Sequence, residues 1–126
     1  MSGWYTAEVM SDINENCLFC DIIVGNLPAE IVASNEEAVA FRDIHPCAPT
    51  HVLVIPKGHI DNALSIEAAH MSQVIKIFEL AHKVAEKEHI EKTGFRLVFN
   101  VGEDADNSVA HLHMHLIGGK RLGPMA

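Results

Sequence analysis

The clearest pattern of apolar and polar residues lies near the end of the chain, in the stretch NSVAHLHMHLIGG from Asn107 to Gly119. Histidines alternate with apolar residues here, at His111, His113 and His115. Successive side chains of a β-strand point to opposite faces. The alternation therefore predicts a strand that packs one face on the core and presents a row of imidazoles to a cleft. A solvated polar face is the alternative, but such a face usually mixes residue types instead of repeating one.

Shorter apolar runs predict the remaining strands. These runs are rich in β-branched or aromatic residues and are bounded by turn residues. They occupy residues 31–33, 38–43, 51–56 and 95–101. The histidine strand is expected to pair with the strand at 95–101.

Two segments have the apolar spacing of amphipathic helices. One is short and runs from Cys17 to Gly25. The other extends from about Ile66 to Glu88, with Ser65 as its N-cap and with Thr93 and Gly94 closing it. The apolar stripe expected along this long helix consists of Met71, Val74, Ile75, Phe78, Ala81 and Ala85.

The order of these elements predicts an α+β fold. Strands follow one another without regular βαβ alternation, which favours an antiparallel β meander with one long helix on one side and one short N-terminal helix. We expect residues 1–16 to form a partly docked N-terminal tail and residues 17–126 to form a single domain.

Composition narrows the class of protein. A content of 48% hydrophobic and 21% charged residues is typical of a globular chain and not of a disordered one. Its formal net charge of -8 argues against nucleic acid as a partner, since phosphate backbones need clustered Lys and Arg. No apolar run is long enough to cross a membrane, and residues 1–16 lack the pattern of a signal peptide. Three cysteines are too few for a disulfide framework, so we expect a cytoplasmic protein.

Two segments together resemble a known family. DIHPCAPTHVLVIPKGHI and NSVAHLHMHLIGG are similar to the histidine triad (HIT) superfamily, whose motif His-X-His-X-His-X-X, with X apolar, is HLHMHLI here. Within it, the chain resembles the bacterial members of the nucleotide-binding Hint branch. The resemblance implies a HIT-like fold, a homodimer whose two central sheets join, and hydrolysis of purine nucleoside phosphoramidates and related nucleotidyl conjugates. The ligand would be a purine nucleoside monophosphate or its phosphoramidate.

The histidines carry the expected catalysis. An ordinary imidazole has a pKa of about 6.5, so at neutral pH it is largely uncharged and able to attack phosphorus. The resemblance assigns this role to the middle histidine, His113, with a nucleotidyl-histidine that water then hydrolyses. His115 and His51 would donate hydrogen bonds to the α-phosphate oxygens. Ser108 would offer a hydroxyl and a backbone N–H, and no cofactor is required for the chemistry.

Other residues are candidates for binding the nucleoside. Asp43 has a carboxylate suited to two ribose hydroxyls, although taken alone it could equally be a turn residue. An apolar group suited to a base comprises Phe19, Ile22, Phe41, Ile44 and Leu53. Phe19, Phe41 and Leu53 could instead be simple core residues. Expected near the sugar and phosphate, with His113 and His115, are Asn100, Asn107, Ser108 and Val109.

The chain departs from the family pattern just before the histidine motif. The family usually has Gly-Gln-Ser there, whereas this chain has Asp106-Asn107-Ser108, preceded by Glu103 and Asp104. Carboxylates beside a phosphate site would repel the ligand unless they point to solvent. His45 also stands where the family often has serine, and the frequent C-terminal tryptophan segment is absent.

A second site is suggested by two cysteines near the start of the chain. Cys17 and Cys20 have the C-x-x-C spacing with which two thiolates share one tetrahedral zinc. Similarity to some bacterial relatives adds His59 and His111 as the other two ligands. Such a zinc would be structural, because a closed four-ligand site leaves no place for water. The alternatives are two buried thiols without a metal, or a redox pair, which the absence of a thioredoxin-like βαβ pattern disfavours.

The sequence is also compatible with three other functions. The chain could be a nucleotide-binding regulatory module with little turnover, or a dinucleoside polyphosphate hydrolase like another HIT branch. A metallohydrolase that uses the histidine row as ligands is less favoured, because the motif strand carries no Asp or Glu to share the metal.

Overall fold

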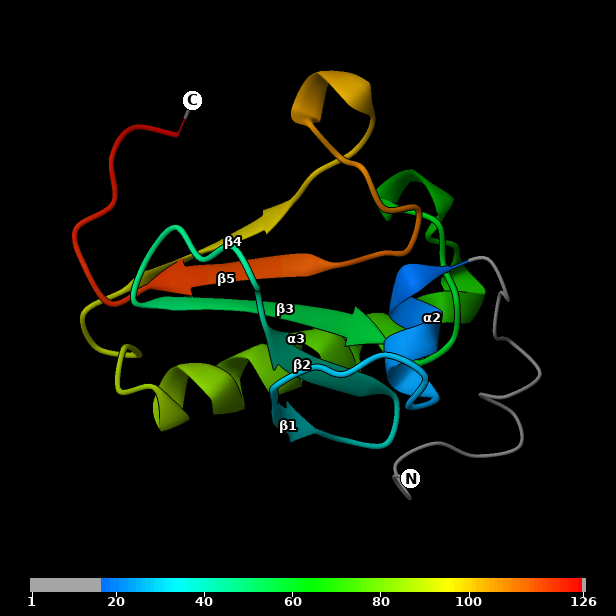
Figure 1. The fold of residues 1–126 in the computed structure, drawn as a ribbon, viewed down its shortest axis with the longest axis horizontal. Coiled ribbons are helices and arrows are strands. Elements are labelled where there is room, and N and C mark those ends of the chain that lie inside the picture. The colour runs from blue at the N-terminus through cyan, green and yellow to red at the C-terminus, as the bar shows by residue number, and fades with distance from the viewer. Residues whose placement is uncertain (1–16, 126) are drawn as a thin grey trace.

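The computed structural model describes residues 17–125, so the expected tail at residues 1–16 lies outside the described residues. The strands are β1 (Ile31–Ser34), β2 (Ala38–Arg42), β3 (Thr50–Pro56), β4 (Phe95–Phe99) and β5 (Met114–Gly118). The α-helices are α2 (Leu18–Ile23) and α3 (Met71–Lys87). This confirms the α+β class, with one long helix and one short helix near the start of the chain (Figure 1). No helix among the described residues is long and apolar enough to cross a membrane.

The five strands form one antiparallel sheet in the order β1-β2-β3-β5-β4. The first three strands form a meander, and β4 pairs with β5 as expected. The sheet as a whole is not the expected meander, because β5 and not β4 lies next to β3. Since both pair antiparallel to β5, β3 and β4 run in the same direction. Parallel strands need a long crossover connection, and α3 lies in that connection. The histidine-bearing strand is therefore an interior strand and not an edge.

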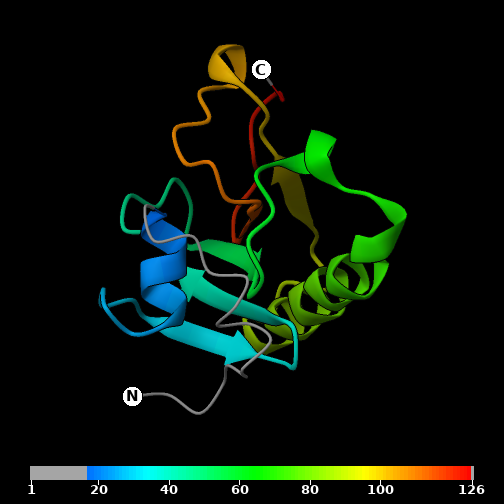
Figure 2. The same cartoon turned by 90° about the vertical axis from the view of Figure 1, so that its right-hand side faces the viewer.

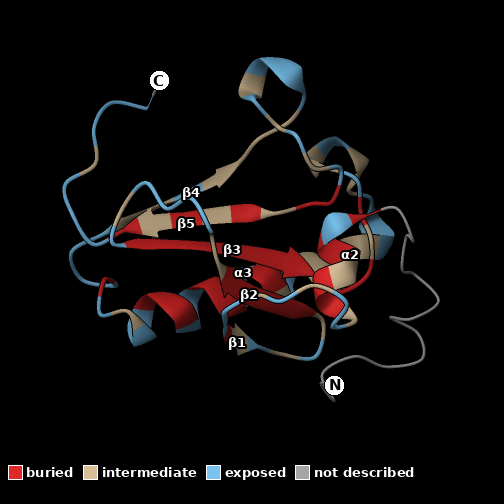
Figure 3. Cartoon of the chain, in the orientation of Figure 1, coloured by how far each residue is buried: buried red, intermediate tan, exposed pale blue. Residues whose placement is uncertain are grey.

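The two faces of the sheet pack against different helices. Alternation along each strand sends one set of side chains to α3, including Val52, Val54, Met114 and Leu116. The other set, including Phe41, Leu53 and Ile55, packs with residues of α2. Figure 2 shows the two helices on opposite sides of the sheet. The strands β2 and β3 are the most deeply buried, whereas β4 has no fully buried residue (Figure 3).

The long helix begins later than its apolar pattern predicts. It starts at Met71 and ends at Lys87, so the expected start near Ile66 and the expected Ser65 N-cap are wrong. A separate 3-10 turn precedes it, closed by reciprocal hydrogen bonds between Glu67 and His70 that form a capping box. Thr93 and Gly94 lie in a turn several residues beyond the end of the helix.

The buried face of α3 is rotated from the expected stripe. Its buried residues are Ile77, Leu80, Ala81, Val84 and Ala85. Of the expected stripe, Met71, Ile75 and Phe78 are instead about half exposed, at 51%, 49% and 46%. The helix thus carries two apolar faces, one on the core and one toward solvent, and a single periodic pattern could not separate them.

The histidine strand is shorter than its alternation predicts. β5 begins at Met114, so His111 and His113 precede the strand and only His115 lies in it. The backbone N–H of Leu112 donates instead to the carbonyl of Ile60, 2.6 Å away, outside the sheet. The apolar positions between the histidines do pack in the core as expected: Leu112, Met114 and Leu116.

Candidate active site

A cavity of about 730 Å³ opens on the α2 side of the sheet. Its volume lies in the range usual for small-ligand sites. All the residues expected to bind the nucleotide line it: Phe19, Ile22, Phe41, Asp43, Ile44, Leu53, Asn100, Asn107, Ser108, Val109, His113 and His115. The loop of Leu27, Pro28 and Ala29 also lines the cavity, and sequence reasoning missed it because no polar or periodic signal marks these residues.

One wall of the cavity is apolar and continuous with the core. Phe19, Phe41 and Leu53 are only 6%, 4% and 6% exposed, and the rings of Phe19 and Phe41 meet edge to face at 5.5 Å. These residues are therefore core residues and cavity wall at once. Ile44 stands at the rim, where it is 85% exposed. A flat apolar ligand would bury this side chain on binding.

Asp43 makes a local turn and also lines the cavity. One carboxylate oxygen, Oδ1, accepts the backbone N–H of His45 at 2.8 Å, which makes a local turn. The other oxygen, Oδ2, lies 3.3 Å from Nε2 of His51. The carboxylate is thereby held in place at the cavity, with acceptor capacity left for a ligand.

The ring of His113 is oriented by its own chain. Its Nδ1 lies 2.7 Å from the backbone carbonyl of His111. A carbonyl can only accept, so Nδ1 carries the proton and Nε2 keeps a lone pair. The ring packs against Phe19 at 5.1 Å and His115 at 5.2 Å between centroids. In the neutral ring, His113 therefore offers the lone pair of Nε2 at the cavity.

Hydrogen bonds through His51 place the proton of His115 on Nε2, the opposite tautomer to that of His113. The backbone N–H of Cys47 donates to Nδ1 of His51 at 3.1 Å, so the proton of His51 is on Nε2. That Nε2–H donates to Nδ1 of His115 at 2.9 Å, which leaves the proton of His115 on Nε2. His115 thus offers a donor at the cavity. His51 is buried and is not among the lining residues.

The electrostatic surroundings keep His115 neutral. The pKa of His115 is lowered to about 4, mainly by burial and also by the nearby imidazoles of His113 and His51. At neutral pH the ring is therefore uncharged and acts as a hydrogen-bond donor, not as a cation.

The loop before β5 contains the departures from the family pattern. Asp106, at the usual glycine position, adopts the left-handed conformation with φ 59° and lines the cavity. Glu103 and Asp104 are exposed and do not line it. Asn107 has a buried side-chain oxygen without a hydrogen-bond partner among residues 17–125. A buried acceptor of this kind favours a donor from a ligand.

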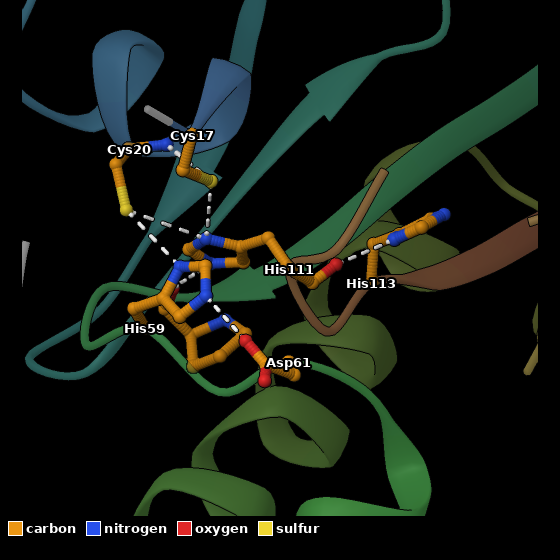
Figure 4. Close-up of polar contacts among 7 residues, drawn as sticks. Cys17, Cys20, His59, Asp61, His111 and His113 are labelled. Atoms are coloured by element: carbon orange, nitrogen blue, oxygen red, sulfur yellow. Dashed lines mark hydrogen bonds and ion pairs between the residues drawn. The ribbon is translucent and has the colours of Figure 1, made fainter. Parts of the chain in front are cut away.

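A cluster of two cysteines and two histidines lies beside the cavity, shown in Figure 4. Nδ1 of His111 is 3.2 Å from Sγ of Cys17 and 3.5 Å from Sγ of Cys20. Nδ1 of His59 is 3.4 Å from Sγ of Cys20. Tetrahedral zinc with ordinary bond lengths places sulfur and nitrogen ligands about 3.6 Å apart. The donor set and its spacing therefore fit a zinc ion.

Both histidines of the cluster are held by their other ring nitrogen. Nε2 of His59 lies 2.8 Å from the carboxylate of Asp61, and Nε2 of His111 lies 3.0 Å from the carbonyl of Pro56. These acceptors keep the proton on Nε2 and turn Nδ1 toward the sulfurs, as metal ligands require. Burial also lowers the pKa of His111 to about 4, which keeps its ring neutral.

Asp43, His51 and His115 form a second group that could hold a metal ion. Sequence reasoning missed it, because the carboxylate comes from beyond β2 and reaches the histidines only in the folded sheet. Here the two ring nitrogens are 2.9 Å apart and joined by a hydrogen bond. An ion would have to replace that bond, so the group favours a hydrogen-bonded chain over a metal centre.

Comparison with known proteins agrees with this geometry. A model of the HIT domain matches residues 24–122. The purine nucleoside phosphoramidase of Escherichia coli is 40% identical over 111 residues, which cover 88% of this chain and 93% of that protein. A HIT family hydrolase from Clostridium thermocellum superposes with a TM-score of 0.85 at 46% identity, covering 88% and 96% of the two chains. A histidine triad protein from Clostridium difficile gives a TM-score of 0.85 at 36% identity, covering 90% and 98%.

Proposed function

The chain belongs to the HIT family, and from this premise we propose that it hydrolyses purine nucleoside phosphoramidates and related nucleotidyl conjugates. The observation that carries the proposal is the hydrogen bond from Nδ1 of His113 to the carbonyl of His111. In the neutral ring, this hydrogen bond places the lone pair of Nε2 at a cavity of about 730 Å³.

The reaction would proceed in two displacements at phosphorus. Nε2 of His113 attacks the α-phosphorus, the P–N bond to the amine breaks, and the leaving amine takes up a proton. Water then attacks the phosphorus and loses a proton as the P–Nε2 bond breaks, which releases the nucleoside monophosphate. One difficult displacement is thereby divided into two easier ones.

Neighbouring residues would stabilise the charge on the phosphoryl oxygens. The Nε2–H of His115 is a neutral donor at the cavity, and Ser108 adds a hydroxyl and a backbone N–H. His51 is buried behind His115, so we assign to it the orientation of His115 through their 2.9 Å hydrogen bond in place of the direct phosphate contact expected from sequence.

The nucleoside would occupy the apolar part of the cavity. The base would lie against Phe19, Phe41 and Leu53, and Ile44 would close over it. Asp43 would accept hydrogen bonds from the two ribose hydroxyls. Asn107 has an unsatisfied side-chain oxygen, which supports a ligand contact there.

The cysteine–histidine cluster would hold a structural zinc through Cys17, Cys20, His59 and His111. When bound, zinc supplies a cross-link between α2 and the segment before β5. The protein would be a cytoplasmic homodimer. Support for the dimer comes from β4, which pairs only with β5 among the described residues, and from the exposed apolar side chains of α3 beside it.

Substitution of the proposed nucleophile tests this function. We expect His113→Ala to abolish hydrolysis of adenosine and guanosine phosphoramidates and to prevent trapping of a nucleotidyl-protein, while nucleoside monophosphate still binds in calorimetry. His82→Ala is the control, because that side chain is 73% exposed on α3, and it should retain wild-type turnover.

Two results would contradict the proposal. If wild-type protein binds nucleoside monophosphate but turns over no substrate, the chain is a regulatory nucleotide-binding module. If dinucleoside polyphosphates in the same panel are cleaved faster than phosphoramidates, the chain belongs with the polyphosphate hydrolases.

A further inference from the structure

His111 belongs to both sites described above. Its ring reaches the sulfurs of Cys17 and Cys20, while its backbone carbonyl accepts the hydrogen bond that orients His113. Figure 4 shows the ring of His113 pointing away from the cluster on the far side of this carbonyl. We propose that the cluster of Cys17, Cys20, His59 and His111 positions the nucleophile, so that the metal it holds controls the rate at which His113 attacks the substrate. This inference rests on the proposed function.

The backbone that carries the two histidines lacks the support of the sheet. β5 begins only at Met114, so residues 111–113 make no ladder with β3 or β4. The segment is held instead by the 2.6 Å hydrogen bond from Leu112 to the carbonyl of Ile60. Ile60 lies between His59, a member of the cluster, and Asp61, which holds the ring of His59. The ring of His111 is a second anchor, because its Nε2 donates to the carbonyl of Pro56 at the end of β3. Both anchors therefore involve a residue in the cluster or next to it in the chain.

A second connection runs through the short helix. Phe19 lies between the two cysteines in α2, and its ring meets those of His111 at 5.9 Å and His113 at 5.1 Å. Cys17 caps this helix, because its sulfur accepts the backbone N–H of Cys20. A metal bound to both sulfurs would fix the helix start and, with it, the aromatic wall against which the nucleophile packs.

A second, smaller cavity reaches the cluster at two of its residues, Cys17 and His59. This cavity of about 350 Å³ is also lined by Asp61, and it gives a metal ion an entry path separate from the nucleotide cavity. Ser108 and Val109 line both cavities, so the loop that holds the substrate phosphate in the proposed function separates the two sites.

The geometry indicates which step the metal affects. Of the residues proposed to contact the nucleoside, Asp43, Phe41 and Leu53 come from or follow β2 and β3, whereas Phe19 belongs to α2. Because most of these residues lie outside α2, the affinity for nucleoside monophosphate should change little, whereas the alignment of His113 should change much. Misplacement of a reacting group by about 1 Å can slow a reaction by about a hundredfold.

Asp61 acts as a positioning residue in this scheme. It touches neither substrate nor metal, but it holds Nε2 of His59 so that Nδ1 faces the sulfurs. Replacing such a carboxylate typically lowers metal affinity by about ten- to a hundredfold. Asp61→Asn should thus weaken zinc binding without removing a ligand. Glu86→Gln is the matched control, because Glu86 also lies beside a histidine, His82, on the exposed face of α3.

The test compares the zinc-loaded full chain, the chain stripped with a chelator, and the two variants at limiting zinc. Three quantities are measured: zinc content and affinity by chelator competition, the ¹⁵N spectrum of the His113 ring, and the single-turnover rate of nucleotidyl-histidine formation. We expect zinc removal to broaden or shift the His113 signals and to slow the single turnover at least about tenfold. Binding of adenosine monophosphate should stay within about threefold. At limiting zinc, Asp61→Asn should show the same changes in the His113 signals and in the single-turnover rate, and both should return to wild-type values when the zinc concentration is raised. Glu86→Gln should match wild type.

Several results would overturn the proposal. It fails if the chain does not bind zinc at a defined stoichiometry, or if zinc removal leaves the His113 spectrum unchanged. It also fails if circular dichroism shows that zinc removal unfolds the whole domain, because the cluster would then serve folding alone. If no form of the protein turns over substrate, the proposed function fails, and the His113 spectrum still decides the coupling between the two sites.

Discussion

Backbone groups decide which nitrogen of each catalytic histidine carries a proton. The carbonyl of His111 forces the proton of His113 onto Nδ1, whereas the N–H of Cys47 forces that of His51 onto Nε2. The first arrangement exposes a lone pair, and the second passes through His51 to give His115 a donor. Two identical side chains thus acquire complementary roles. The sequence motif predicts the residues but not these roles, because the deciding groups are backbone atoms.

Burial of His115 should make the stability of the domain depend on pH. Its pKa is lowered to about 4, whereas a histidine in the unfolded chain has a pKa of about 6.5. The unfolded chain therefore takes up this proton first as the pH falls. The stabilising contribution is complete above about pH 6.5 and is lost as the pH falls toward about 4. We expect His115→Gln to flatten this part of the profile of unfolding free energy, measured with urea between pH 4 and 8.

The control for this prediction is an exposed histidine. His82→Gln, with its side chain 73% exposed, should keep the wild-type profile. Parallel profiles for wild type and His115→Gln would show that His115 does not titrate differently in the folded and unfolded states.

Asp106 carries a conformational cost at the edge of the cavity. With φ 59° it occupies the left-handed region, which glycine adopts without strain. We expect Asp106→Gly to raise the free energy of unfolding by about 1 kcal/mol, measured by urea denaturation. Because the substitution also removes a carboxylate from the cavity, KM for an anionic phosphoramidate should fall.

Asp104→Gly provides the comparison within the same loop. Asp104 does not have a positive φ, and it lies outside the cavity lining. It should therefore gain no stability and leave KM unchanged. Equal effects of the two substitutions would mean that loop charge alone, and not the backbone conformation of Asp106, sets the stability.

At the scale of the elements, one carboxylate joins the end of α3 to two strands. Glu88 accepts two hydrogen bonds from the guanidinium of Arg42, each 2.9 Å long, and a third from the hydroxyl of Thr50 at 3.2 Å. The hydrogen bonds from Arg42 are the main reason that the pKa of Glu88 is lowered. Arg42 ends β2 and directly precedes Asp43, so this contact also holds the proposed ribose-binding residue.

Glu88→Gln should lower the free energy of unfolding by about 1–3 kcal/mol, because it removes charge-assisted hydrogen bonds at a side chain that is only 14% exposed. Thermal or urea unfolding measures this change. Glu79→Gln removes the exposed pair with Lys76 and should change stability by less than about 1 kcal/mol. Similar changes in both variants would indicate that the Glu88 contact is no stronger than a surface ion pair.

The elements were predictable where a local pattern decides them and not where a distant contact does. The strands β1, β2, β3 and β4 lie within two residues of their expected ends, because alternation and turn residues mark them. The start of α3 differs from the prediction because a capping box between Glu67 and His70 closes a separate 3-10 turn directly before the helix begins at Met71. The histidine strand is shorter than predicted because Leu112 bonds to Ile60, a contact between segments far apart in the sequence.

The candidate site followed the same rule. The resemblance supplied the residues that line the cavity, and the structure brings all twelve expected nucleotide-binding residues around it. The approach of Asp43 to His51 and the double role of His111 were not predictable, because they depend on how β2, β3 and β5 meet in the sheet.

At the scale of the whole molecule, one edge of the sheet combines an open strand with exposed apolar side chains. β4 pairs only with β5 among the described residues, and Leu97 on it is 38% exposed. The rings of Phe99 on β4 and Phe78 on α3 are 6.3 Å apart, so the exposed face of α3, with Met71 and Ile75, continues this surface. An open edge beside an apolar face favours pairing with a second copy about a twofold axis.

Substitution at the two edges of the sheet tests this arrangement. We expect the wild-type chain to sediment as a dimer and Leu97→Glu to sediment as a monomer at micromolar concentration, because the new carboxylate would be buried without a partner in the β4 interface. Ile31→Glu is the matched control, since Ile31 is 40% exposed on β1 at the opposite edge, and it should remain dimeric. If Ile31→Glu dissociates while Leu97→Glu does not, the copies join through β1, and the extended sheet would then place the two nucleotide cavities in a different relation.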